Sequence, residues 1–371
     1  MTDNPTRVLG FDIARAVAVF GMVVVNFKVV MGAESAGPSW LVWTIGLLDG
    51  RAAATFVLLA GAGLSLLSRR SRNSADASGI ARDRRTVLRR AVFLFFVGLA
   101  YTPIWPADIL HFYGVYIAVA ALFLTAPTRV LLTAASLLAL LFMVLLLVLN
   151  YETGWDWEGL NYIGFWTPAG MMRHLFFNGF HPVVPWLAFM LVGMALGRLD
   201  LSNADTRNRV LRWSVSAAVL GESVSWGLRR WLMTSALSVQ EKADLIAVVG
   251  TDPMPPVILY MVAAGGTAVT IVVACISLGQ RFHSAVWMRP IVATGQMALT
   301  LYVAHVVIGM GVLEAAGALE NQSLNFALVS AGIFCAASLV FASRWSLRFR
   351  RGPLESLMRF ATDPRDRRRP K

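Results

Sequence analysis

Apolar runs of about twenty residues recur along the whole chain, and this pattern limits the fold more than any other feature of the sequence. A helix of that length covers the hydrocarbon core of a bilayer, which is roughly 30 Å thick, at about 1.5 Å of rise per residue. The bilayer core supplies no hydrogen-bond partners, and a helix satisfies its own backbone groups there. The sequence therefore predicts an all-α, polytopic integral membrane bundle.

We predict ten transmembrane helices, of which the second and seventh are the least regular, because Asp49 and Arg51 border one and Glu222 interrupts the other. Their predicted ranges are 11–31, 50–68, 88–104, 108–126, 129–150, 182–198, 211–232, 256–279, 290–311 and 323–343. A single transmembrane domain over 1–350 then comprises a catalytic-like region at 7–200 and C-terminal helices at 210–345. A basic cytoplasmic tail follows at 351–371, and we expect the chain after Phe360 to be disordered.

Basic residues gather in three segments that fall on one side of a ten-helix bundle: Arg69 to Arg90, Arg198 to Arg212, and Arg344 to Lys371. Because Lys and Arg concentrate in cytoplasmic loops, we predict that both termini lie inside. The net charge of +12 is therefore explained by topology and anionic headgroups, or by attraction of a polyanionic cytosolic cofactor. Binding to nucleic acid is not expected, because the cations are scattered over membrane loops and a short tail.

Ionisable side chains inside the predicted spans are few, and each costs at least about 2.5–3.5 kcal/mol at the bilayer centre. Asp12 and Arg15 share a helix face at the cytoplasmic end of the first span, either as a helix-start ion pair or as part of a donor site. A larger polar group falls at the outer ends or in the outer halves of five predicted helices: Asn26, Asp49, Arg51, Asp108, His111, Asn178, His181 and His305.

Histidine can act as a general base or acid and can carry an acyl group, so three histidines with carboxylate and amide neighbours indicate a functional site. A lone membrane histidine is usually a satisfied core residue, so the prediction rests on the set and not on any one of them. As catalytic residues we predict His305, His111, His181, Asp108 and Asn26. As donor- or substrate-binding residues we predict Asp12, Arg15, Asp49, Arg51, Asn178 and Tyr302, which lies one turn from His305.

Two other histidines rank below this group. His174 lies in a Trp- and Phe-rich outer segment, and His283 lies in a basic loop beside Arg281. A three-ligand zinc site from His111, Asp108 and His305 is conceivable, but the chain has no short-spaced ligand motif, so no metal is expected.

An ordered set of short motifs covers most of residues 7–310. It begins with Arg7–Met22 and Asn26, continues with Asp49–Arg51, Leu59–Leu64 and Asp108–Leu110, and ends with Asn178–Pro182, Gly193–Arg198 and Gly295–Tyr302 with His305. In this order the motifs resemble the bacterial relatives of heparan-α-glucosaminide N-acetyltransferase, and equally the YeiB-type membrane proteins.

The resemblance implies a multi-pass acyltransferase of the bacterial cytoplasmic membrane. Such a protein takes an acyl group from a cytosolic thioester such as acetyl-CoA and delivers it to a hydroxyl or amine on an extracytoplasmic glycan. The implied partners are the lipid bilayer and a glycan or small-molecule acceptor. The identity of the acceptor, the acyl chain length and the choice between a monomer and a homodimer stay open.

One departure concerns the first span. In the related sugar O-acyltransferases an arginine there is followed eleven residues later by a catalytic histidine, whereas here Arg15 is followed at that spacing by Asn26. Asparagine can orient a group or contribute to an oxyanion hole, but it cannot act as a base. If acyl transfer is retained, the base is His305, His111 or His181, in that order of preference. If it is lost, the chain is a transporter or flippase for a small or lipid-linked solute.

Overall fold

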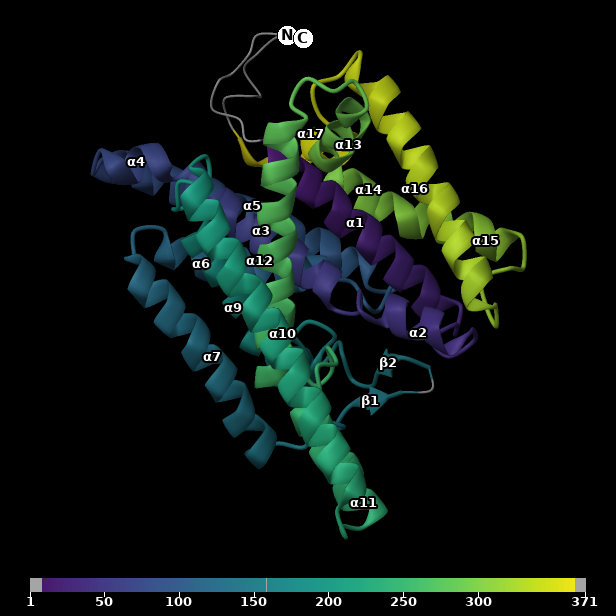
Figure 1. Ribbon diagram of the computed structural model, residues 1–371. Coiled ribbons are helices and arrows are strands. Elements are labelled where there is room, and N and C mark those ends of the chain that lie inside the picture. Colours follow the sequence, from purple (N-terminus) through teal and green to yellow (C-terminus); the bar gives the residue numbers. More distant parts are fainter. Residues whose placement is uncertain (1–8, 158, 364–371) are drawn as a thin grey trace. The chain divides into compact units, whose positions relative to one another are not determined.

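The computed structural model describes residues 9–157 and 159–363, and these residues are almost entirely helical (Figure 1). The described part contains one sheet, formed by two antiparallel two-residue strands, β1 (Trp155–Asp156) and β2 (Asn161–Tyr162). The start of the first motif, Arg7 and Val8, and the tail after Asp363 lie outside the described residues. The all-α class predicted from the apolar runs is confirmed.

Six helices of the described chain are long and apolar enough to cross a membrane, which makes this a polytopic membrane protein. They are Leu9–Val30, Ser39–Leu67, Thr128–Val148, Ile258–Arg281, Ala298–Ala315 and Leu324–Ser346. A seventh span results if Pro168–Asn178 and Val183–Leu196, which meet at an angle of 49°, cross the membrane together. The total of ten spans, the cytoplasmic position of the termini and the division into one domain and a tail stay predictions.

Several helix bounds differ from the predicted ones. Most of the third predicted span lies in the longer helix α5 (Ala77–Tyr101), which ends three residues before that span does, and the seventh lies within α10 (Ala204–Thr234). Both helices begin in the basic segments before the apolar runs, because arginine is itself a good helix former. The predicted tail also contains a helix, α17 (Pro353–Thr362), so the expected disorder does not begin directly after Phe360.

The chain divides into two compact units, one formed by residues 1–56, 201–211 and 268–360 and the other by residues 57–200, 212–267 and 361–371. In the first unit, α1 (Leu9–Val30) packs against α13 (Met288–Gln296) and α16 (Leu324–Ser346), as Figure 1 shows. It also contains α2 (Ser39–Gly46), α14 (Ala298–Ala304), the π-helical turn η3 (His305–Met310), α15 (Gly311–Ala315), most of α17, the first residues of α3 (Arg51–Leu67) and of α10, and the second half of α12 (Ile258–Arg281).

In the second unit, α5 packs along α6 (Leu110–Ala120), and α7 (Thr128–Val148) packs along α9 (Val183–Leu196). A Cβ on Gly61 would lie 1.9 Å from the carbonyl oxygen of Met190, so this glycine serves close helix packing, as its sequence context predicts. The unit also contains α4 (Arg69–Asn73), the 3-10 turn η1 (Ala121–Phe123), α8 (Pro168–Arg173), the π-helical turn η2 (His174–Asn178), α11 (Val239–Val249), and parts of α3, α10 and α12 (Ile258–Arg281).

The ninth predicted span is broken, because Met297 leaves the helical conformation between α13 and α14. The break exposes backbone N–H groups at the start of α14, and Glu355 of α17 accepts two of them. Its Oε1 lies 2.8 Å from the nitrogen of Leu299 and 3.1 Å from that of Thr300, and its Oε2 accepts the Thr300 hydroxyl at 2.5 Å. A carboxylate at a helix N-terminus is stabilising, so α17 holds the helix that leads to His305.

Replacing Glu355 by Gln keeps the shape of the side chain but removes its charge. We expect the free energy of unfolding to fall by about 1–2 kcal/mol, since hydrogen bonds to charged groups contribute more than neutral ones. Glu314→Gln is the matched control, because that exposed side chain has no hydrogen bond or ion pair within the described chain. Thermal unfolding of the two variants in detergent checks this, and equal shifts would contradict the role given to Glu355.

Candidate functional site

The polar residues singled out in the sequence belong to both units. Those of the first unit are Asp12, Arg15, Asn26, Asp49, Arg51, Tyr302 and His305. Those of the second unit are Asp108, His111, Asn178 and His181, to which the structure adds His174. Each unit therefore contains a buried histidine with a polar partner: His305 with Asn26 in the first unit and His111 with Asp108 in the second.

In the first unit, Asn26 of α1 and His305 of η3 form a hydrogen bond, with 2.9 Å between Asn26 Nδ2 and His305 Nε2. The other ring nitrogen, Nδ1, donates to the backbone carbonyl of Tyr302. Because a carbonyl only accepts, the proton of the neutral ring lies on Nδ1, and the Nε2 lone pair accepts from the Asn26 amide. Asn26 thus orients an imidazole, the role that its side chain allows.

Aromatic rings surround His305, which is fully buried. Phe27 stacks near it with ring centroids 6.5 Å apart, Tyr302 lies at 5.1 Å and Phe334 at 6.4 Å. The residue also begins a π-helical turn, an irregularity that is frequent at functional sites. Aromatic side chains thus pack around the imidazole of His305, and its Nε2 is bonded to Asn26.

Three other predicted residues of the first unit, Asp12, Arg15 and Asp49, form ion pairs. Asp12 and Arg15 lie 2.6 Å apart, as their spacing predicts, and Gln296 Nε2 is 3.4 Å from Asp12 Oδ2. Lys28, which was not among the predicted site residues, contacts both carboxylate oxygens of Asp49 at 2.6 Å and is only 4% exposed.

Arg51 is buried and donates to the backbone carbonyl of Asp49 at 3.2 Å. The Lys28–Asp49 ion pair and this hydrogen bond together link the end of α1 to the start of α3. The sequence signal that could have identified Lys28 is its place as the single basic residue between Arg15 and Arg51.

In the second unit, Asp108 precedes α6 and binds its first turn. Asp108 Oδ2 accepts the backbone N–H groups of Leu110 at 2.8 Å and His111 at 3.2 Å, and lies 3.1 Å from His111 Nδ1. With Nδ1–H donated to the carboxylate, the neutral ring has its lone pair on Nε2. Within the described chain this buried Nε2 has no hydrogen-bond partner. A carboxylate-oriented imidazole with a vacant nitrogen is the arrangement of a general base.

His174 lies next to this pair, although sequence analysis ranks it below the other candidate histidines. Its ring is nearly parallel to that of His111, with 5.8 Å between the centroids and 20° between the planes. It is buried, and its Nδ1 has no partner among the described residues. The four-residue spacing of His174 and Asn178, which places them on one helix face, is the signal that could have identified it.

His181 is the third histidine of this cluster and lies in the short segment between η2 and α9. Its ring contacts those of Phe112 and Trp186 at centroid distances of 6.0 and 4.6 Å, and its backbone carbonyl accepts the Tyr116 hydroxyl at 2.5 Å. The buried Nδ1 of His181 also lacks a partner in the described part of the chain. In the second unit the rings of three histidines therefore contact Phe112: His111 and His181, which were predicted as site residues, and His174, which was not.

The side chain of Asn178, predicted to contact substrate, binds the protein itself. Its Nδ2 donates to the carbonyls of Tyr151 and Thr153 at 2.7 and 2.9 Å, and its Oδ1 accepts the Tyr162 hydroxyl at 2.9 Å. Burial raises the pKa of the Tyr162 phenol, so the phenol stays protonated and remains a donor. Asn178 thus positions the segment that contains β1 and β2.

That segment and the end of α5 enclose a pocket with a cavity volume of about 410 Å³. Its lining includes five aromatic side chains and one histidine: Trp155, Tyr162, Phe165, Trp166, Phe180 and His174. A pocket with apolar walls and few polar groups is typical of small-molecule sites. Because His174 lines it and stacks on His111, a molecule in this pocket lies one ring away from the Asp108–His111 pair.

Among the described residues, no group of three or more His, Cys, Asp or Glu side chains is placed to hold a metal ion. The two clusters themselves consist of acid–base and hydrogen-bonding groups: a histidine paired with a carboxylate in the second unit and a histidine paired with an amide in the first.

The fold and these clusters define a polytopic helical membrane protein with buried histidines paired to a carboxylate or an amide. The family model "Heparan-alpha-glucosaminide N-acetyltransferase, catalytic" matches residues 7–226, more than half of the chain. The chain therefore belongs to this family of membrane acetyltransferases, as its motifs indicate. A second model, "Protein of unknown function (DUF418)", matches residues 207–365, in agreement with the YeiB-like resemblance. No curated protein sequence matches the chain.

Proposed function

We propose that the protein is a membrane-embedded acyltransferase that uses acetyl-CoA from the cytoplasm to acetylate a hydroxyl or amine of an extracytoplasmic glycan. The observation that carries this proposal is the Asp108–His111 pair with its vacant Nε2. Both residues lie within the part of the chain that the catalytic family model matches.

The sequence ranks His305 first as the base, but two observations favour His111. The Nε2 of His305 is occupied by Asn26, whereas that of His111 is vacant within the described chain. In addition, His305 lies in the region matched only by the second family model. We therefore assign the base to His111 and give His305 a role in positioning α1 against η3.

In the proposed reaction, His111 Nε2 removes the proton from the acceptor hydroxyl or amine as that atom attacks the thioester carbonyl. Asp108, which accepts from Nδ1–H, stabilises the imidazolium that forms. The tetrahedral intermediate then collapses, the C–S bond breaks, and Nε2 returns the proton to the leaving thiolate. The products are the acetylated acceptor and free CoA, and the enzyme returns to its starting state.

In this proposal the aromatic pocket holds the sugar ring of the acceptor, and the reacting hydroxyl or amine extends past the His174 ring to reach His111 Nε2. The C–H faces of a sugar ring are apolar and pack against aromatic faces, while the hydroxyls at its edge remain available to polar groups. Trp166 is 63% exposed and lines the pocket, so it can contact a ligand without being needed for the core.

Replacing Trp166 by Ala tests this site. We expect KM for the glycan acceptor to rise about tenfold, which corresponds to about 1.4 kcal/mol of lost contact, with little change in KM for acetyl-CoA. Trp213→Ala is the control, since Trp213 is 74% exposed on α10 and does not line the pocket. A rise in KM for acetyl-CoA alone would place the donor, rather than the acceptor, in this pocket.

A transporter or flippase is the second candidate, because discontinuous helices line many transport sites. The chain has such breaks at Met297 and between η2 and α9. The deciding experiment follows release of CoA from acetyl-CoA by the purified protein with a panel of amino sugars and oligosaccharides. Turnover that depends on acceptor and on His111 supports the acyltransferase. Solute uptake into proteoliposomes without an acyl donor, together with no CoA release, would support the transporter instead.

A further inference from the structure

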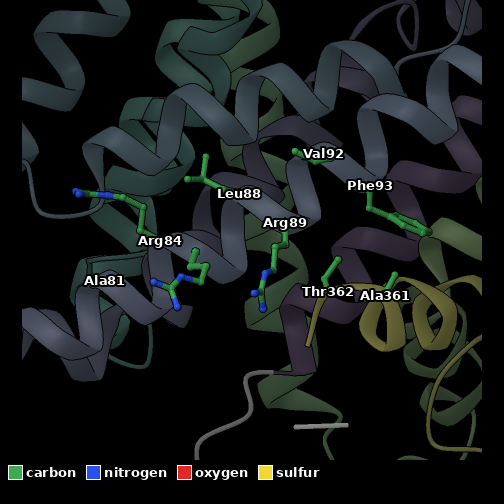
Figure 2. A pocket seen from close by; sticks show the side chains of 9 residues that line it. Ala81, Arg84, Leu88, Arg89, Val92, Phe93, Ala361 and Thr362 are labelled. Atoms are coloured by element: carbon green, nitrogen blue, oxygen red, sulfur yellow. The ribbon is translucent and has the colours of Figure 1, made fainter. Parts of the chain in front are cut away.

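A second pocket, with a cavity volume of about 740 Å³, lies on the basic helix α5, away from the residues of the proposed reaction. Three arginines of α5 line it: Arg84, Arg85 and Arg89. Leu88, Val92 and Phe93 of the same helix also line it, as do Ala361 and Thr362 of α17, and Figure 2 shows Arg84 and Arg89 among these side chains. All the lining residues belong to the second unit.

The arginines give this pocket a positive charge that the described protein does not neutralise. Arg85 and Arg89 are exposed and four residues apart, so both side chains lie on one face of α5. Within residues 9–157 and 159–363, no carboxylate forms an ion pair with either of them. Arg84 is held in place, because its Nε donates to the carbonyl of Ala121 at 3.1 Å.

The α17 part of the pocket lining adds an unsatisfied hydroxyl. Thr362 is 3% exposed, and its Oγ1 has no hydrogen-bond partner in the described chain. A buried hydroxyl without a partner is costly unless something else bonds to it. A phosphate group in the pocket would accept a hydrogen bond from the Thr362 hydroxyl and would also neutralise the charge of the arginines.

An apolar stripe continues from the arginines along the same helix. Leu88, Val92 and Phe96 follow at intervals of four residues and are 39%, 56% and 63% exposed. From Arg85 to Phe96 the helix rises roughly 16 Å, close to the length of a phospholipid acyl chain. The polar end and the apolar stripe together match a molecule with an anionic head and a long hydrocarbon tail.

We propose that this pocket binds an anionic phospholipid, with its phosphate among Arg84, Arg85 and Arg89 and an acyl chain along Leu88, Val92 and Phe96. A nucleotide fits the observations less well. It would leave the stripe uncovered, and the lining contains no carboxylate or amide side chain to bind a base or ribose. Arginines at the membrane surface attract anionic lipid headgroups. Here the three arginines line a pocket, which can hold one headgroup in a defined place.

The test uses the full-length protein in nanodiscs of phosphatidylcholine, with phosphatidylglycerol added in steps, and native mass spectrometry to count bound lipid. The double variant Arg85→Gln, Arg89→Gln should bind phosphatidylglycerol roughly 30-fold more weakly, since each interfacial arginine contributes roughly fivefold. The matched control is Arg209→Gln, Arg212→Gln, which removes the same charge from exposed positions on α10. Equal losses in the two double variants would show only diffuse surface charge and overturn the proposal.

A second pair of variants separates a lipid from a free anion. Val92→Ser should weaken binding of a long-chain phosphatidylglycerol but not of inorganic phosphate, whereas Val219→Ser, at an exposed position on α10, should change neither. Unchanged lipid binding by Val92→Ser would overturn the acyl-chain site. Displacement of the lipid by CoA at equimolar concentration, with loss of CoA binding in the arginine variant, would assign the pocket to a nucleotide. Thermal unfolding of each variant confirms that it is folded.

Discussion

Replacing His111 by Asn should lower kcat for acyl transfer by about 10²–10⁴-fold, the usual contribution of a general base. The amide is smaller than the imidazole but keeps a polar atom near the position of Nδ1, and it has no nitrogen that can take a proton. Because His111 is 1% exposed and its ring packs against Phe112 and His174, the larger Asn is preferable to Ala. Release of CoA by the purified variant, measured at saturating acetyl-CoA and acceptor, gives the effect directly.

Three further variants make this result specific. His283→Asn removes an exposed loop histidine and should leave kcat unchanged. Asp108→Asn should lower kcat strongly as well, since the neutral amide cannot stabilise the imidazolium. His305→Asn should affect stability more than kcat, because Nε2 of His305 is held by Asn26. If His305→Asn abolishes turnover while His111→Asn retains it, the base is His305, the residue that sequence analysis ranks first.

The elements that could be predicted from sequence are those with a local signal. Hydropathy identified the six helices that are long and apolar enough to cross a membrane, and three-residue spacing identified the contacts of Asp12 with Arg15 and of Asp108 with His111. The first contact forms within one turn of α1, and the second joins the first turn of α6 to the residue two positions before that helix, so a short stretch of sequence contains the geometry of each.

The parts that could not be predicted depend on distant segments. Asn26 and His305 were each recognised as candidates, but their hydrogen bond joins residues 279 positions apart. The π-helical turns that begin at His174 and His305 are set by packing rather than by local preference, and no Pro marks the break at Met297. The capping of α14 by Glu355 could not be predicted either, because Glu355 belongs to helix α17, which lies in a segment that the sequence predicts to be a basic tail.

The approach of α13 to α1 depends on the absence of a side chain at Gly295. A Cβ there would lie 1.8 Å from the backbone carbonyl oxygen of Asp12, far inside van der Waals contact. The obstacle is backbone, which cannot rotate away as a side chain does, so α13 and α1 would have to move apart. That displacement would alter the Asp12–Gln296 contact and shift the break at Met297 that precedes His305.

Gly295→Ala should therefore lower the free energy of unfolding by about 3 kcal/mol, at the upper end of the usual cost of overpacking. Gly332→Ala is the matched control in the same unit. It lies in α16, and a Cβ there meets no atom within 4 Å. Since alanine is a better helix former than glycine, this control should be neutral or stabilising by up to about 1 kcal/mol. The two identical substitutions are thus expected to shift the unfolding temperature in detergent in opposite directions. Equal shifts would mean that α1 and α13 do not meet at Gly295.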